Sequence, residues 1–228
     1  MPANKTALII GASRGLGLGL VERLREDGWN VVATVRDPAK ATHLAARPGV
    51  QVETLEMNSN TQLDTLQQRL RGQTFDLLFV NAGIMGPTDQ NPERAQLADV
   101  GDLFMTNAVS PIRVAERFSP QLRQNSGVIA FMSSALGSVS IPNEPELSLY
   151  KASKAALNSM INSFVVRLGD IPLTVLAVHP GWVRTDMGGE GADIDVATST
   201  RGILEQVKAN AGKGGLHFIN YKGDSLIW

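Results

Sequence analysis

Residues 6–17 read TALIIGASRGLG, a short apolar run followed by Gly11, Gly15 and Gly17. The pattern predicts a buried strand, a tight turn and then a helix. Glycines in such a turn permit backbone angles closed to other residues and let a pyrophosphate approach the main chain, while the helix start supplies unpaired N–H groups. A ligand-free turn accounts for one or two of these glycines. Three after a first strand favour a dinucleotide-binding turn.

The same alternation of strand and helix continues along the chain. Further β-rich apolar runs occupy residues 31–35, 50–55, 75–80, 128–132, 173–178 and 216–219. Their continuous apolarity predicts strands covered on both faces, and helical spacing occurs between them, as in Leu63, Leu66 and Leu70. The order predicts an α/β fold with a doubly wound parallel sheet of the Rossmann type. Without a linker or repeat, we expect a single domain over residues 1–228.

Composition limits the classes of function. The chain has 228 residues, 43% of them hydrophobic, no cysteine and a net charge of −1, so no basic block favours nucleic acid. The longest apolar runs are far shorter than the ~20 residues that cross a bilayer, and the start lacks a signal-peptide pattern, so we expect a cytoplasmic protein. The histidines, His43, His179 and His217, are far apart, which argues against a metal site.

Two arginines bear on the choice of dinucleotide. The second strand ends without the acid that binds the adenosine ribose of NAD, and Arg36 follows it instead. With Arg14 in the glycine turn, two guanidinium groups could converge on a 2′-phosphate. We therefore expect NADP(H) rather than NAD(H). The alternative is that both arginines are solvated surface residues, with Asp37 partly neutralising Arg36.

An acid–base pair is predicted near the middle of the chain. On a helix, Tyr150 and Lys154 are four residues apart and share one face. A phenol has a pKa near 10, and an adjacent ammonium is expected to lower it toward neutrality. Ser134, at the end of the apolar run 128–132, could donate a hydrogen bond to the same substrate oxygen. In isolation such a pair is more often an exposed amphipathic one; beside a glycine turn it indicates catalysis.

Taken in order, GASRGLG at 11–17, NAG at 81–83, Asn107, SS at 133–134, YKASK at 150–154 and HPGWVRT at 179–185 resemble the short-chain dehydrogenase/reductase family over essentially the whole chain. The carboxyl-terminal third is similar to C-signal-like and sniffer-type carbonyl reductases. The resemblance implies a catalytic set of Ser134, Tyr150 and Lys154, completed by Asn107, which would hold a helix kink and a relay water. It also implies that Lys154 binds the nicotinamide ribose and Thr185 the carboxamide.

The full cofactor set implied in this way is Gly11, Ser13, Arg14, Gly15, Leu16, Gly17, Arg36, Asn58, Asn81, Ala82, Gly83, Tyr150, Lys154, Pro180, Gly181, Val183 and Thr185. Two positions depart from the family pattern: Ile10 replaces a threonine that buttresses the turn, and Asn58 replaces an aspartate that touches adenine. Apolar residues just after the motifs are expected to line a substrate pocket: Met85, Leu136, Ile141, Trp182 and Met187. Trp182 could instead pack under its loop. The glycine-rich segment 186–195 is expected to form a mobile lid.

These observations predict an NADPH-dependent oxidoreductase that interconverts a ketone or aldehyde and the corresponding alcohol, a small-molecule substrate, with Tyr150 as the acid/base. The alternative is a signalling or regulatory protein that binds the dinucleotide with little turnover; a scaffold without ligand is a third. We expect a homodimer, because the Tyr150 helix is apolar on more than one face, although burial within one chain would also explain this. The apolar residues concerned are Leu149, Leu157, Met160, Ile161, Phe164 and Val165.

Overall fold

The computed structural model describes residues 4–141, 145–170 and 172–228. Seven parallel strands form one sheet in the order β3-β2-β1-β4-β5-β6-β7. From β1, the strands β2 and β3 extend the sheet to one side and β4 to β7 extend it to the other, which is the doubly wound arrangement predicted above. The strands are β1 (Thr6–Ile10), β2 (Asn30–Val35), β3 (Val50–Thr54), β4 (Leu77–Val80), β5 (Val128–Met132), β6 (Thr174–His179) and β7 (Gly215–Asn220).

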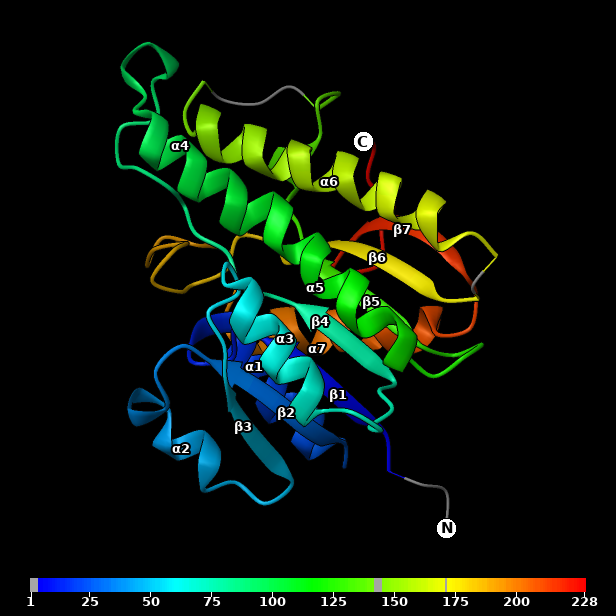
Figure 1. Cartoon of the computed structure of the whole chain (residues 1–228). Coiled ribbons are helices and arrows are strands. Elements are labelled where there is room, and N and C mark those ends of the chain that lie inside the picture. Colours follow the sequence, from blue (N-terminus) through cyan, green and yellow to red (C-terminus); the bar gives the residue numbers. More distant parts are fainter. Residues whose placement is uncertain (1–3, 142–144, 171) are drawn as a thin grey trace.

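Helices cover both faces of the sheet (Figure 1). One core layer packs α3, α5 and α6 against the strands, and the other packs α1, α2 and α7. Successive strand residues alternate between the layers: Leu8 and Ile10 enter the first, Ala7 and Ile9 the second. The helices are α1 (Gly15–Glu26), α2 (Thr42–Ala45), α3 (Asn60–Arg69), α4 (Leu97–Phe104), α5 (Ser110–Phe118), α6 (Ser148–Leu168) and α7 (Val196–Asn210). Within the described residues, none of them has the length and apolarity of a membrane span.

Several strand ends differ from the predicted ones. The run 75–80 was predicted as one strand, but β4 begins at Leu77. The reason is that Phe75 pairs with Leu122 outside the sheet, while the Asp76 carboxylate turns back to accept from the Thr6 amide. Strands β6 and β7 each end one residue later than predicted, at His179 and Asn220, which pair with each other.

The apolar pattern of α6 is explained inside the chain. Each of the six apolar residues named above is either buried or packs against the first core layer: Leu149, Leu157, Ile161 and Phe164 are buried, and Met160 and Val165 are partly buried. Burial within one chain therefore accounts for the pattern. The homodimer stays a prediction without this support.

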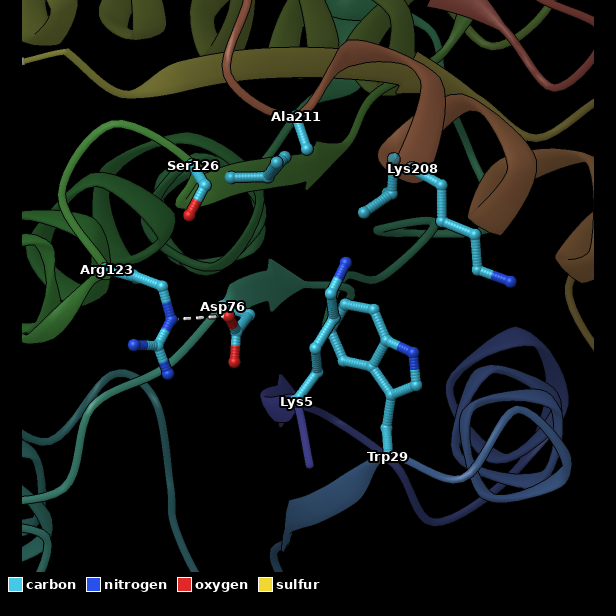
Figure 2. Close-up of a pocket in the computed structure, with 9 residues that line it drawn as sticks. Lys5, Trp29, Asp76, Arg123, Ser126, Lys208 and Ala211 are labelled. Atoms are coloured by element: carbon cyan, nitrogen blue, oxygen red, sulfur yellow. Dashed lines mark hydrogen bonds and ion pairs between the residues drawn. The ribbon is translucent and has the colours of Figure 1, made fainter. Parts of the chain in front are cut away.

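The amino-terminal edge of the sheet holds a cavity of about 320 Å³, walled by Trp29 and rimmed by Lys5 and Lys208 (Figure 2). At its side, Asp76 accepts from Arg123 Nε at 2.7 Å and from the Thr6 amide at 2.9 Å. These contacts satisfy the buried carboxylate and tie β1 and β4 to the segment before β5. None of the predicted site residues lines this cavity; they lie toward the opposite edge, at the carboxyl ends of the strands.

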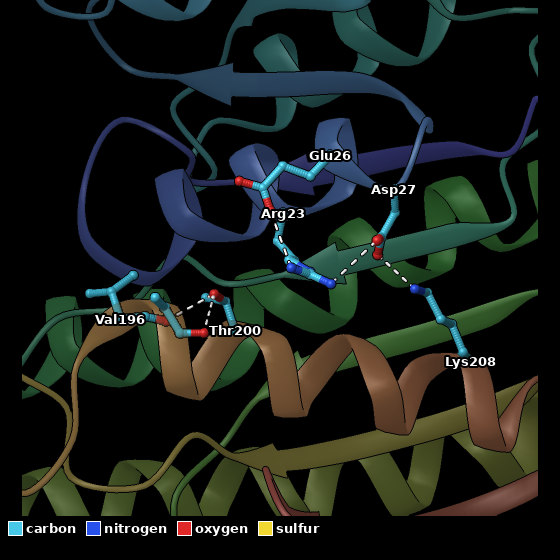
Figure 3. Close-up of polar contacts among 7 residues, drawn as sticks. Arg23, Glu26, Asp27, Val196, Thr200 and Lys208 are labelled. Carbon is cyan, nitrogen blue, oxygen red and sulfur yellow. Dashed lines mark hydrogen bonds and ion pairs between the residues drawn. The ribbon is translucent and has the colours of Figure 1, made fainter.

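Helices α1 and α7 pack closely because Gly19 of α1 has no side chain. A Cβ there would lie 2.4 Å from Val196 Cγ1 and 3.2 Å from Thr200 Cγ2. Along the same pair of helices, Arg23 contacts Glu26 and Asp27, and Asp27 also pairs with Lys208 (Figure 3). The close contact fixes α1, whose first residues belong to the glycine turn, against α7.

Gly19→Ala is expected to lower the free energy of unfolding by up to about 2 kcal/mol, because overpacking costs ~1–3 kcal/mol and the gain in helix propensity is only ~1 kcal/mol. Gly101→Ala, at an exposed position of α4 where a Cβ meets nothing within 4 Å, is the matched control and should be stabilising. Denaturant unfolding of both variants measures this. Equal effects of the two substitutions would contradict the packing account.

Candidate active site

The glycine turn between β1 and α1 is shaped for a close ligand. Gly11 and Gly15 have φ of +84° and +54°. A Cβ on Gly17 would lie 2.0 Å from the Gly11 carbonyl oxygen, so only glycine fits there. The helix that follows has no side-chain cap at Arg14 and no acidic residue in its first turn. Its first N–H groups and the positive end of its dipole thus suit the phosphates of a dinucleotide.

Two side chains hold the turn in place. The Gly11 amide donates to Thr34 Oγ1 at 3.0 Å, and Asn81 Nδ2 donates to the Gly11 carbonyl at 2.7 Å. Thr34 thus supplies, from β2, the hydroxyl that Ile10 cannot. Asn81 acts on the turn through its side chain, from the end of β4. Sequence reasoning missed Thr34; the only sign of it is one polar residue in the apolar run 31–35.

The two arginines expected at the 2′-phosphate lie at this edge, and both are exposed. Asp37 does not neutralise Arg36: its carboxylate accepts from the Ala39 amide at 3.1 Å and lies 3.8 Å from Lys40 Nζ. Arg14 differs, because its guanidinium pairs with Asp186, which lies in the loop after β6, at 2.8 Å. Arg36 is therefore available to bind an anion, whereas Arg14 must first give up its pair with Asp186.

Asn58, expected near adenine, is tied to its neighbours in the structure. Its Nδ2 donates to Thr106 Oγ1 at 2.9 Å and its Oδ1 accepts from Ser110 Oγ at 2.7 Å. The side chain thereby joins the segment after β3 to the turn between α4 and α5. Its contact with adenine stays a prediction.

The residues expected to be catalytic come together at the carboxyl end of β5. Ser134 follows that strand, and Tyr150 and Lys154 lie one turn apart on α6; their exposed fractions are 7%, 9% and 4%. Lys154 Nζ lies 5.7 Å from the centre of the Tyr150 ring and donates to the Met132 carbonyl at 2.9 Å. Ser134 Oγ accepts from the Leu136 amide at 3.1 Å, which leaves its own hydrogen free to be donated. The arrangement matches the predicted shared face of the helix.

Burial shifts the pKa values of both Tyr150 and Lys154. It raises the pKa of Tyr150 to about 12 and lowers the pKa of Lys154 to about 8. The expectation that the Lys154 ammonium would lower the pKa of the phenol is therefore wrong, because desolvation of the buried phenolate dominates. Near pH 7, Tyr150 carries its proton and Lys154 is still largely charged. A protonated phenol is the form that can act as an acid.

Asn107 lies in a π-helical turn, Met105–Val109, between α4 and α5. Its Oδ1 accepts from the Ile84 amide and its Nδ2 donates to the Ile84 carbonyl, both at 2.8 Å, and to Ser153 Oγ at 3.0 Å. Ser153 Oγ in turn donates to the Tyr150 carbonyl at 2.7 Å. The expected helix irregularity is present. Asn107 connects the segment after β4 to the helix that carries Tyr150.

The apolar residues expected at a substrate pocket fall into two groups. Met85, Leu136 and Ile141 are partly buried, whereas Trp182 and Met187 are 54% and 46% exposed. Trp182 contacts its own loop, as the alternative expected: its indole Nε1 donates to the Gly188 carbonyl at 2.8 Å.

The segment expected to form a lid contacts the glycine turn. The Thr185 methyl group would lie 3.6 Å from a Cβ on Gly15, and Asp186 carries the pair to Arg14. Backbone hydrogen bonds between Trp182, Arg184 and Ile194 close the loop at its base. Its mobility stays a prediction.

Nearby, burial lowers the pKa of His179 to about 4, so this residue is a neutral, packed side chain. Among the described residues no three His, Asp or Glu side chains gather as a metal site.

Comparison with known proteins agrees with this geometry. The family model described as short chain dehydrogenase matches residues 5–194. C-signal of Myxococcus xanthus is 32% identical over 154 residues, 67% of this chain and 92% of that protein. A carbonyl reductase from Pseudomonas aeruginosa PAO1 in complex with NADP is 37% identical with a TM-score of 0.92, over 99% of this chain and 100% of that one.

The carbonyl reductase Sniffer of D. melanogaster is 29% identical with a TM-score of 0.88, over 99% of both chains. The sheet order, the glycine turn and the buried pair on α6 are thus found in a chain whose sequence matches one family profile over most of its length. The chain belongs to the short-chain dehydrogenase/reductase family, and its structural neighbours include carbonyl reductases.

Proposed function

We propose that the protein is an NADPH-dependent carbonyl reductase that interconverts a ketone or aldehyde and the corresponding alcohol. The observation that carries the proposal is the buried pair of Tyr150 and Lys154 beside Ser134, at the carboxyl edge of the sheet where the glycine turn also lies. The solved structure of a relative with NADP supports the choice of cofactor.

The glycine turn and the two arginines would hold the dinucleotide. The first N–H groups of α1 suit the pyrophosphate, and Arg36 suits the 2′-phosphate that distinguishes NADPH from NADH. Lys154 and Thr185 are proposed to contact the nicotinamide end. When bound, NADPH supplies the hydride for the carbonyl carbon.

The protein's own groups manage the proton and the developing charge. Tyr150, protonated near pH 7, gives its proton to the substrate oxygen. Ser134 donates its free hydroxyl hydrogen to the same oxygen and stabilises the negative charge that develops there. The phenolate left on Tyr150 lies beside the Lys154 ammonium, which favours that charged form. Asn107 is proposed to support the return of a proton to Tyr150 through water.

The similarity to C-signal favours one other function, a signalling protein that binds the dinucleotide without turning over a substrate. The buried pair argues for the enzyme. Keeping an ammonium and a phenol 4% and 9% exposed costs desolvation free energy, and a ligand sensor gains nothing from a proton donor placed there.

Tyr150→Phe removes only the hydroxyl and is expected to lower kcat by at least ~10³-fold, since proton donation and orientation are both lost. Affinity for NADPH should stay within about threefold, because the ring is retained. Absorbance at 340 nm with a panel of carbonyl substrates measures turnover, and nucleotide fluorescence measures binding. If the unaltered protein binds NADPH but reduces no substrate in the panel, the signalling function is favoured.

The pH dependence of carbonyl reduction should follow Lys154 rather than Tyr150. Lys154 loses its proton as the pH rises through about 8, while Tyr150 keeps its proton until about 12. We expect kcat/KM for the carbonyl to be level from about pH 6 to 7 and to fall above about pH 8. The reason is that kcat/KM reports the pKa values of the enzyme before the carbonyl substrate binds. A rise in reductase activity through this range would contradict the assignment.

Arg36→Ala should raise the Kd for NADPH by about 10–100-fold and leave the Kd for NADH almost unchanged, since a charge-assisted hydrogen bond to the 2′-phosphate contributes ~1.5–3 kcal/mol. Arg69→Ala, which removes a surface arginine paired with Glu53, is the control. Titration of each variant with both nucleotides measures the ratio. Parallel losses for NADPH and NADH would place Arg36 away from the 2′-phosphate.

A further inference from the structure

Among the residues that the structure describes, the helix that carries Tyr150 begins without a side-chain cap of its own. Leu147, the residue before the first turn of α6, has the left-handed φ of +61° and makes no side-chain capping bond, and the first turn of the helix has no acidic residue. The first N–H groups of a helix have no partner within it, so they need an acceptor from elsewhere. Tyr150 is the third residue of this helix, and its own amide is one of these groups.

The acceptor comes from a loop nearly sixty residues earlier in the chain. Gln90 Oε1 accepts from the Tyr150 amide at 2.9 Å. The same side chain donates through Nε2 to the Pro87 carbonyl at 2.6 Å and the Met85 carbonyl at 3.2 Å. The Gln90 main-chain oxygen also accepts from Ser148 Oγ at 3.3 Å. Within the described residues, these hydrogen bonds therefore join two places: the segment after β4 and the start of α6.

We propose that Gln90 is a positioning residue for the reaction. It fixes the position of Tyr150 relative to the Met85 side of the substrate site. The inference rests on the proposed function. It follows from the geometry, because one rigid amide holds the backbone of the proton donor at one end and the backbone of an expected substrate-lining residue at the other.

The two ends of the amide have separable roles. Loss of the acceptor leaves the Tyr150 amide unpaired in a part-buried setting, so the first turn of α6 frays and the phenol moves relative to Ser134. Displacements of about 1 Å at a reacting group cost up to ~10²-fold in rate. Loss of the donor instead frees the Met85 and Pro87 carbonyls, which loosens the loop and weakens substrate binding without moving the phenol.

Two substitutions distinguish these roles. Gln90→Ala removes both ends and is expected to lower kcat by about 10–100-fold and to raise KM for the carbonyl. Gln90→Glu keeps an acceptor for the Tyr150 amide, and a negative charge there is favourable at a helix N-terminus. It loses the donor, so kcat should return to within about threefold of the unaltered protein while KM stays raised.

Gln96→Ala is the matched control, because Gln96 is an exposed glutamine of the same loop that donates to the Arg94 carbonyl. Its kinetic constants should equal those of the unaltered protein. A kcat for Gln90→Ala equal to that of Gln96→Ala, or a failure of Gln90→Glu to recover kcat, would overturn the proposal.

Amide hydrogen exchange of residues 148–153 tests the cap without any substrate. Exchange should speed up in Gln90→Ala, return toward the unaltered rate in Gln90→Glu and stay unchanged in Gln96→Ala. Unaltered exchange in Gln90→Ala would also overturn the proposal. If the unaltered protein reduces no carbonyl while exchange follows the expected order, the proposed function has failed and the cap itself stands.

Discussion

The hydrogen bond from Lys154 Nζ to the Met132 carbonyl is the contact on which the site depends. It joins the second turn of α6 to the last residue of β5, and it gives a buried ammonium a fixed acceptor. The close approach requires Gly137 on the neighbouring segment, where a Cβ would lie 2.9–3.0 Å from atoms of Lys154. Helix, strand and loop thus meet at Lys154: the strand at its ammonium and the loop at its backbone.

Around this contact, the site is assembled from tethers between segments that are distant in the chain. Thr34 and Asn81 hold the glycine turn, Asn107 holds the segment after β4 against α6, and Gln90 holds the start of α6. Each tether pairs a side-chain amide or hydroxyl with a main-chain group or another side chain. Such polar contacts are directional, so they define positions that apolar packing alone leaves adjustable.

The sequence predicts the fold and much of the site because both depend on local patterns. Continuous apolar runs mark the strands, glycine spacing marks the turn, and the four-residue spacing of Tyr150 and Lys154 places them on one face. The tethers could not be predicted, because the partners of Thr34 and Gln90 are chosen by tertiary structure. Neither could the direction of the pKa shift of Tyr150, since it depends on how completely the ring is buried.

The π-helical turn at Met105–Val109 has a consequence for the whole rod formed by α4 and α5, which run as one continuous helix in Figure 1. A π turn accommodates one residue more than an α-helical turn. The extra residue changes the direction in which the side chains after it point, since each α-helical residue advances the helix by ~100°. Deleting it would rotate the helix beyond it by ~100° and turn Ile112 and Phe118 away from the core.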